Sequence, residues 1–324
     1  MPLFGRKPRG TRLFFATDIH GSEQCFRKWL NAASVYEVDA LILGGDITGK
    51  ALVPLVSSNG SWTGELFGQQ VYATGDDELT ALRHRIRMSG SYDLLLSPEE
   101  KRDLDAHPDA VDEVFHRAVR DSIERWIALA EERLEAAGVP GFVILGNDDF
   151  PEVADALRNG TRLRYAEDEV CELPGGLEMI SFGFSTPTPW NTPRELPEQE
   201  IERRLEALAS RLQEPEHAVF NVHCPPQGTH LDQAPRLDSE LRMVASAGGV
   251  EMVSVGSTAV RSVIERYGPM LGLHGHVHDS PGVQEVGRSL CINPGSAYNE
   301  GVVRGAFVEV SKEHGIQRWQ MVEA

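Results

Sequence analysis

The stretch Leu271-Gly-Leu-His274-Gly275-His276-Val277-His278-Asp279 governs how the rest of the sequence is interpreted. Its apolar lead-in, from Pro269 to Leu273, is typical of a short buried strand that ends at a glycine. His276 and His278 follow this strand, and in an extended backbone two residues at i and i+2 project to the same side. Because imidazole is a common neutral metal ligand, the stretch predicts part of a metal site.

Four further apolar runs end in residues of the same ligand type. They lead to Asp18 and His20 after 12–17, to Asp46 after 40–44, to Asn147 after 141–145, and to His223 after 218–222. In open α/β folds, sites assemble at the carboxyl ends of strands. A set of Asp, Asn and His without thiolates suits a hard or borderline metal, so the sequence predicts one metal site built from five strand ends.

Each of these residues also has a simpler interpretation when it is taken alone. Asp18 and Asp46 could be helix N-caps that follow a strand. Asn147 could form a turn, and His223 could be a buried histidine with satisfied hydrogen bonds. The ordered set favours ligands, because five separate strand ends would otherwise carry such residues by coincidence.

The order of these motifs along the chain resembles the calcineurin-like metallophosphoesterase superfamily, from Asp18 to Tyr298. The motifs are Asp18-x-His20, Gly45-Asp46, Gly146-Asn147-x-Asp149, His223 and Gly275-His276-x-His278. Residues 44–49, 223–229, 256–261 and 293–296 are similar to one bacterial and archaeal branch of uncharacterised members.

The resemblance implies an α/β fold, a four-layer α/β/β/α sandwich with two mixed central sheets and helices outside. It also implies two divalent or trivalent metal ions, which we expect to be Mn, Fe or Zn. The implied ligands are Asp18, His20 and His278 for the first metal, Asn147, His223 and His276 for the second, and Asp46 as the bridge.

The implied activity is hydrolysis of a phosphomonoester or phosphodiester by a metal-bridging hydroxide that attacks phosphorus in line. Two divalent metals, the carboxylates of Asp18 and Asp46, and one hydroxide leave about +1 for an anionic substrate. Two alternatives stay open: a non-catalytic binding scaffold that retains the fold, and a nuclease of the same superfamily.

The chain departs from the family at position 148, where the usual residue is a histidine that is a candidate general acid. Here it is Asp148, whose pKa two nearby dications should lower. We therefore interpret Asp148 as a weak acid or as a hydrogen-bond acceptor, for example to a ligand histidine. His230 is another candidate proton donor, although a solvated loop histidine is its simpler interpretation.

Composition and charge narrow the class of protein. The chain has 324 residues, 41% of them hydrophobic, and no apolar run near 18 residues, so we expect no membrane span. Its four cysteines are widely spaced, which favours reduced thiols and a cytoplasmic location, and the resemblance makes Cys224 a packing residue. A net charge of −18 disfavours nucleic acid as a partner and leaves a small phosphate ester as the expected substrate.

The chain reads as a single domain, 1–324, with a largely helical insertion at about 50–138. Such an insertion is longer than usual βα connections, and we expect it to shape the substrate pocket or a homodimer contact. Within it, the basic stretch 83–87 is interpreted as a solvated surface. Helices are expected at 22–34, 76–88, 109–137, 151–158, 198–213 and 258–267, a loop and hairpin at 51–74, and a hairpin at 161–185 around 174–176.

Overall fold

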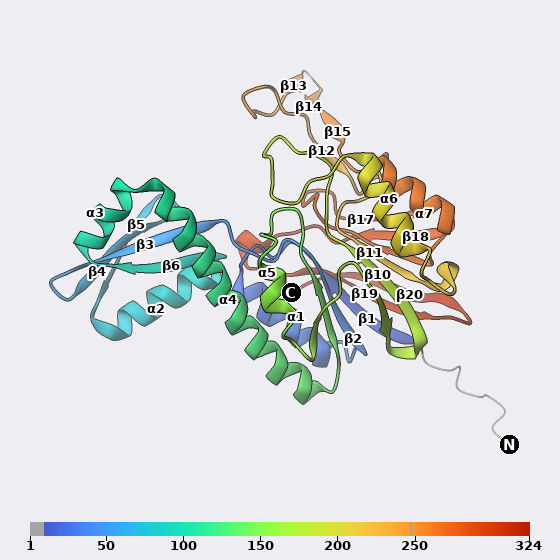
Figure 1. Ribbon diagram of the computed structural model, residues 1–324, viewed down its shortest axis with the longest axis horizontal. Coiled ribbons are helices and arrows are strands. Elements are labelled where there is room, and N and C mark those ends of the chain that lie inside the picture. The colour runs from blue at the N-terminus through green and yellow to red at the C-terminus, as the bar shows by residue number, and fades with distance from the viewer. Residues whose placement is uncertain (1–9, 247) are drawn as a thin grey trace.

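The computed structural model describes residues 10–246 and 248–324, and two six-stranded sheets form its centre (Figure 1). In the first sheet β1, β2, β7 and β8 run parallel, β19 pairs antiparallel with β1, and β20 pairs antiparallel with β19. Its strands are, in spatial order, β20 (Gly315–Glu323), β19 (Arg304–Ser311), β1 (Thr11–Ala16), β2 (Ala40–Gly44), β7 (Gly141–Ile144) and β8 (Leu163–Tyr165).

The second sheet is also mixed, with four parallel strands between two antiparallel edge strands. Its spatial order is β17 (Gly282–Val286), β18 (Ser289–Asn293), β16 (Leu271–Leu273), β11 (Val219–Val222), β10 (Leu177–Phe182) and β9 (Val170–Leu173). The hairpin expected at 161–185 is the β9–β10 pair, joined by the 3-10 turn Pro174–Gly176. β8 was wrongly included in that hairpin, because it pairs with β7 in the first sheet.

Alternating side chains explain why the two sheets pack face to face. Phe15 and Ile42 on the first sheet and Met179 and Leu271 on the second are fully buried in one shared cluster. Their neighbours along the strands point the other way, since successive strand residues face opposite sides. Phe14, for example, belongs to a different cluster, which helices cover.

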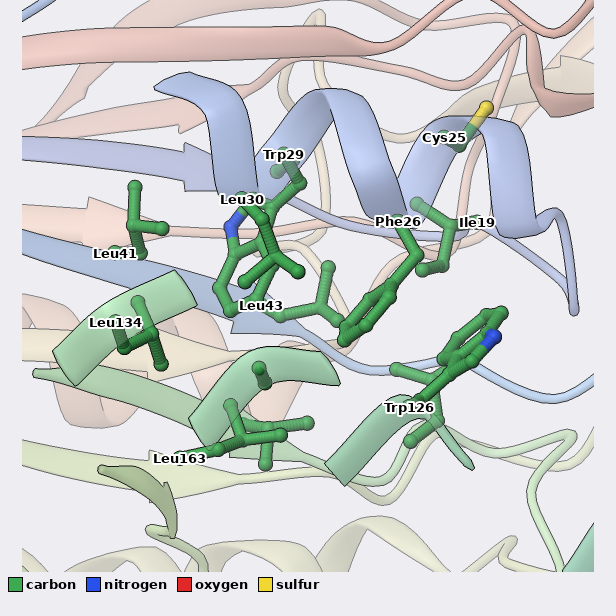
Figure 2. Close-up of a cluster of buried hydrophobic side chains, with 14 of the residues drawn as sticks. Ile19, Cys25, Phe26, Trp29, Leu30, Leu41, Leu43, Trp126, Leu134 and Leu163 are labelled. Atoms are coloured by element: carbon green, nitrogen blue, oxygen red, sulfur yellow. The ribbon is translucent and has the colours of Figure 1, made fainter. Parts of the chain in front are cut away.

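Helices cover both outer faces and complete an α/β/β/α sandwich. α1 (Glu23–Val35) and α4 (Pro108–Ala137) pack on the first sheet, while α6 (Glu198–Ala209) and α7 (Thr258–Tyr267) pack on the second. Figure 2 shows Phe26 and Trp126 between α1 and α4, with ring centroids 4.3 Å apart and nearly parallel planes. Ser22 caps α1 as expected, its hydroxyl accepting from the Cys25 amide.

Residues 51–106 form a separate four-stranded sheet beside the sandwich, at the left of Figure 1. Its spatial order is β5 (Gln69–Thr74), β4 (Ser61–Leu66), β3 (Ala51–Ser58) and β6 (Ser91–Leu96), and α2 (Gly75–Met88) and α3 (Pro98–Ala106) accompany it. The expected hairpin is β4–β5. The expected loop before it is strand β3, which tolerates Pro54 because β4 pairs only with 56–58 and leaves one side of Pro54 unpaired.

The long helix α4 connects this smaller sheet with the sandwich. Phe115 in its first half contacts Tyr92 of the β6 strand, with ring centroids 5.7 Å apart. Trp126 and Leu134 in its second half belong to the core of the sandwich. The boundaries of an insertion at about 50–138 within a single domain therefore stay a proposal, because α4 belongs to both parts.

The remaining elements are short. They are α5 (Val153–Leu157), the strand pairs β12 (Gln233–Pro235) with β15 (Met252–Ser254) and β13 (Ala245–Ser246) with β14 (Gly249–Val250), and the 3-10 turns Pro215–His217 and Tyr298–Glu300. In the described part of the chain, no helix combines the length and the apolar character that crossing a membrane requires.

Candidate metal centre

The seven predicted ligands lie at the carboxyl ends of five strands. The first sheet contributes the loops after β1, β2 and β7, and the second sheet contributes the loops after β11 and β16. Because parallel strands end at the same edge of a sheet, packing the sheets together brings these loops to one place. The residues are Asp18 and His20 after β1, Asp46 after β2, Asn147 after β7, His223 after β11, and His276 and His278 after β16.

Asp18, His20, Asp46 and His278 form the first cluster, with one donor atom of each within 4.8 Å of the others. His278 Nε2 lies 3.0 Å from His20 Nε2 and 3.1 Å from Asp18 Oδ1. Asp46 Oδ2 lies 3.8 Å from His20 Nε2. The side chains are buried except that of His278, which is 30% exposed, so the cluster opens to solvent on this side.

Asp46, His223 and His276 form the second cluster, which Asn147 joins through its amide oxygen. Asn147 Oδ1 lies 3.1 Å from His223 Nε2 and 2.6 Å from His276 Nδ1. The amide nitrogen donates to Thr192 Oγ1 at 3.0 Å, which keeps the oxygen toward the imidazoles. Asp46 Oδ2 is also 3.4 Å from His223 Nε2, so the same carboxylate oxygen faces both clusters.

The spacing of these donor atoms fits metal ions. Mn, Fe and Zn bind nitrogen and oxygen at about 2.0–2.2 Å, which places neighbouring ligand atoms of one ion roughly 3.0–3.5 Å apart. The imidazole nitrogens of His20 and His278 face each other at 3.0 Å beside a carboxylate. These two imidazole nitrogens and the carboxylate offer more lone pairs than protons, and a bound cation would accept those lone pairs.

Four of the seven residues have backbone conformations that residues other than glycine rarely adopt. The φ angle is +52° at Asp18, +38° at His20, +49° at Asp46 and +66° at His276, all in the left-handed region. The loops after β1 and β2 support each other there, since Asp18 N donates to Gly45 O at 2.9 Å and His20 N to Asp46 O at 3.0 Å. Such conformations cost of order 1–3 kcal/mol each and concentrate at functional sites.

The left-handed turn at His276 corrects one expectation from the sequence. β16 ends at Leu273, so His276 and His278 do not reach the site by alternation along a strand. Instead, His276 N donates to the Asp18 carboxylate at 3.1 and 3.2 Å, and the turn sends the two imidazoles to different clusters. The turn requires Gly275, because a Cβ there would lie 2.3 Å from Asp18 Oδ2.

A buried carboxylate that sequence reasoning did not select, Asp149, holds two of the ligand loops together. It accepts from the amides of Gly146, Ile47 and Thr48 at 2.7, 3.1 and 2.8 Å, and from the Thr48 hydroxyl at 2.6 Å. These donors belong to the loops after β2 and β7. The motif Gly-Asn-x-Asp contains Asp149, but the motif alone does not separate a supporting carboxylate from a ligand.

Three further contacts orient the ligands from outside. His223 Nδ1 lies 2.8 Å from Gly44 O, which directs Nε2 toward the site. Ser296 Oγ donates to Asp18 O at 2.6 Å. The Tyr298 ring lies 4.7 Å from the His20 ring, so it forms part of the wall.

Burial and charge shift the pKa values of the cluster in opposite directions. Burial lowers the pKa of His20 to about 3 and of His276 to about 4, which makes both rings neutral donors. Burial acts against the carboxylate charge of Asp18, but His223 and other neighbours outweigh it and lower its pKa to about 2. The pKa of His223 rises to about 10, because Asp46 and Asp18 outweigh burial. A metal ion would take the place of that proton.

Asp148 lies at the rim of the centre and pairs with a lysine that sequence reasoning missed. Its amide donates to Asp46 Oδ1 at 2.9 Å, and its carboxylate forms an ion pair with Lys50. Asp148 Oδ2 is 4.0 Å from His20 Nδ1, too far for the expected hydrogen bond to a ligand histidine. Burial and the charge of Asp46 raise the pKa of Asp148, whereas the expected lowering depends on metal cations.

The structure does not bring His230 into either cluster. Its side chain is exposed, and neither group of ligand atoms found in the described residues includes it. Cys224 is buried, and burial raises its pKa to about 12. His274 is buried as well, with Nδ1 2.8 Å from Val222 O, so it supports the strand end and stays outside the ligand groups.

Comparisons with known proteins identify the fold. No family model matches the chain. The uncharacterized protein MJ1162 of Methanocaldococcus jannaschii is 29% identical over 171 residues, which are 52% of this chain and 67% of that protein. The crystal structure of TT1561 of Thermus thermophilus is 13% identical, with a TM-score of 0.52 over 97% of this chain and 98% of that chain.

Solved structures with lower TM-scores include an archaeal phosphodiesterase (0.36, 10% identity, 97% of this chain and 100% of that chain). They also include a 5'-nucleotidase precursor of Thermus thermophilus (0.35, 14% identity, 97% of this chain and 54% of that chain). The fold expected from the sequence, an α/β sandwich with two mixed central sheets, is confirmed, and the likeness to these solved structures is one of fold alone.

Proposed function

We propose that the protein is a phosphoesterase that depends on two metal ions. The observation that carries this proposal is the pair of ligand clusters that share one oxygen, Asp46 Oδ2. A structural site would need a single closed set of ligands, whereas two adjoining clusters suit the paired metals of phosphoryl-transfer sites.

Each residue has a role in this proposal. Asp18, His20 and His278 hold one metal, Asn147, His223 and His276 hold the other, and Asp46 holds both. When bound, two such ions activate a water molecule as the nucleophile and polarise the phosphoryl oxygens. The exposed side of His278 leaves room for a substrate to reach the pair.

Residues of the chain itself handle the substrate at the rim. Lys50 is 52% exposed and lies beside Asp148, so its ammonium can bind a phosphate oxygen while Asp148 holds it in position. Asp148 takes the place of the family histidine, and its pairing with Lys50 favours a positioning role over proton donation. Protonation of the leaving group then falls to solvent, with His230 as the other candidate donor.

The substrate in this proposal is a small phosphate ester, and the metals are Mn, Fe or Zn. The net charge of −18 supports a small substrate over nucleic acid, because it repels a phosphate backbone. Four free, buried cysteines support the cytoplasmic location that we propose. A homodimer is also part of the proposal.

Metal analysis followed by turnover of two aryl phosphates tests the function. We expect two metal ions per chain after reconstitution, with hydrolysis of bis(4-nitrophenyl) phosphate, 4-nitrophenyl phosphate, or both, and loss of turnover on chelation. Single-stranded DNA serves as a third substrate. Metal binding without any turnover would favour the binding scaffold, and preferred cleavage of DNA would favour the nuclease.

A further inference from the structure

Four arginines from three helices line one cavity on the outer face of the sandwich. The cavity has a volume of about 340 Å³ and lies where α1, α2 and α4 meet. Its arginines are Arg27 on α1, Arg83 and Arg87 on α2, and Arg125 on α4. The net charge of the chain is −18, so a cluster of four cations has the opposite sign to the charge of the chain as a whole.

Two carboxylates, those of Glu23 and Asp93, pair with arginines of this cavity. Arg27 pairs with Glu23 at 2.6 Å. Arg83 and Arg87 share the single carboxylate of Asp93, each with its Nε 2.5 Å from a different oxygen. Two arginines on one buried carboxylate leave a surplus of one positive charge at this point.

Arg125 adds a second surplus charge. In the part of the chain that the structure describes, it forms no hydrogen bond or ion pair, although Glu23, Asp93 and Asp121 influence it from a distance. Burial and the neighbouring charge of Arg87 lower its pKa, as expected for a cation that faces other cations. The four arginines of the 340 Å³ cavity therefore carry about two positive charges more than Glu23 and Asp93 neutralise.

Trp126 adds an aromatic side chain to the wall of the smaller cavity. Trp126 lines the cavity beside Arg125 and is 4% exposed. The guanidinium groups make a wall that is rich in hydrogen-bond donors, which is the chemistry that recognises an anion.

A second cavity of about 490 Å³ adjoins the first and shares Arg83, Arg87 and Arg125 with it. Leu94 and Leu104 contribute apolar surface to its lining, and its further charged side chains are Glu100, Asp103, Asp121 and Arg117. Both volumes lie in the range of roughly 300–1,000 Å³ that is usual for ligand pockets. An anion held by the shared arginines thus has both apolar and acidic surface next to it.

We propose that Arg83, Arg87 and Arg125 form a binding site for a phosphate group, separate from the metal centre. The ligand is a dianionic phosphate, either free or carried by an organic molecule whose apolar part occupies the adjoining cavity. Two surplus positive charges match its two negative charges, and the guanidinium fork matches its oxygens. This inference does not depend on the proposed hydrolysis.

Calorimetric titration of the metal-loaded protein with inorganic phosphate tests the site. We expect two binding events, one at the metal centre and one at the arginines. Arg125→Gln should weaken one of them at least about tenfold, the loss of one charged hydrogen-bond donor, while the inhibition constant of phosphate against aryl phosphate turnover stays unchanged. Arg125→Lys keeps the charge and should retain part of the binding.

Arg133→Gln is the matched control, because Arg133 is an exposed arginine of the same helix that lines neither cavity. An equal loss in this variant, or an unchanged isotherm in Arg125→Gln, would overturn the site. Without hydrolytic activity the inhibition arm disappears but the calorimetric comparison remains, so the two proposals fail separately. Titration with phenylphosphonate identifies the source: tighter binding than phosphate indicates an organic phosphate, and equal or weaker binding indicates free phosphate.

Discussion

The two central sheets contribute different chemistry to the metal centre. The first sheet supplies both carboxylates, Asp18 and Asp46, together with one amide and one imidazole. The second sheet supplies imidazoles only, from three histidines. Each cluster draws ligands from both sheets, so neither cluster is complete within one sheet. The negative charge of the ligands is thus concentrated on the first-sheet side of the interface.

This division has a structural cause. Asp18 and Asp46 sit on left-handed turns whose backbones are hydrogen-bonded to each other, and Asp149 ties the Asp46 turn to the next loop. On the second sheet, His223 follows β11 directly and its ring is held by Gly44 O of the first sheet. The positions of Asp18 and Asp46 therefore depend on strained loops, and the orientation of the His223 ring depends on the contact between the two sheets.

The largest expected effect comes from removing the carboxylate that both clusters share. Asp46→Ala should lose at least one metal and lower kcat/KM by roughly 10³-fold or more, equivalent to about 4 kcal/mol. Asp46→Asn should be milder on metal binding yet severe on rate, because the charge balance of the site changes. Metal content and aryl phosphate turnover measure both, with exposed Asp112→Ala as control. Full turnover by metal-replete Asp46→Ala would rule out a shared ligand.

Removing one imidazole of the second sheet should affect one metal only. His278→Ala should weaken the first metal and His223→Ala the second, with roughly 10²-fold loss of activity each, about 3 kcal/mol, that added metal partly restores. His274→Ala is the matched control, since His274 is buried in the same stretch but is outside the ligand groups. It should lower stability while both metals remain. Loss of metal in His274→Ala would contradict the assignment of His274 as a supporting residue outside the ligand groups.

Leaving-group dependence tests the departure at position 148. If no side chain supplies the proton, esters of nitrophenol should react about 10²–10⁴-fold faster than alkyl esters, the usual value of general acid assistance. Asp148→Ala should change activity only modestly, and Asp148→His should narrow the gap if the new imidazole reaches the leaving oxygen. A flat dependence on leaving-group pKa, with chemistry rate-limiting, would mean that another group donates the proton.

Substitution of Asp149 tests how much the strained ligand loops of the first sheet depend on this carboxylate for their stability. Asp149→Asn replaces one acceptor oxygen with an amide that faces backbone donors, so unfolding free energy should fall by about 1–3 kcal/mol. Chemical denaturation measures this change, with metal affinity recorded alongside. Asp168→Asn is the control: this carboxylate lies on another left-handed residue away from the clusters. Unchanged stability in Asp149→Asn would remove Asp149 from the account of the site.

Much of this fold could be predicted because its signals are local. Ser22 before an apolar stripe predicts α1, and apolar runs that end in Asp, Asn or His predict the strand ends. In the smaller sheet the β4–β5 hairpin could be predicted, but β3 could not, because Pro54 argues against a strand until the one-sided pairing of β3 is known.

Residues that act through distant contacts could not be predicted either. Lys50 gains its position from Asp148, and the basic stretch 83–87 looked like a solvated surface until the fold placed Arg125 beside Arg87. The i, i+2 spacing of His276 and His278 indicated the right residues for the wrong reason, since a left-handed turn separates their directions.

The smallest expected effect is at His230, which lies in the loop after β11 and outside both clusters. Its imidazole is exposed and in neither ligand group, and surface substitutions usually change free energies by less than about 0.5 kcal/mol. His230→Ala should therefore change kcat by no more than about twofold for both aryl and alkyl esters. The alkyl ester is the sharper probe, because only a poor leaving group needs a proton in the transition state. A selective collapse of alkyl ester hydrolysis in His230→Ala would identify His230 as the donor and would mean that its loop closes over the metals during turnover.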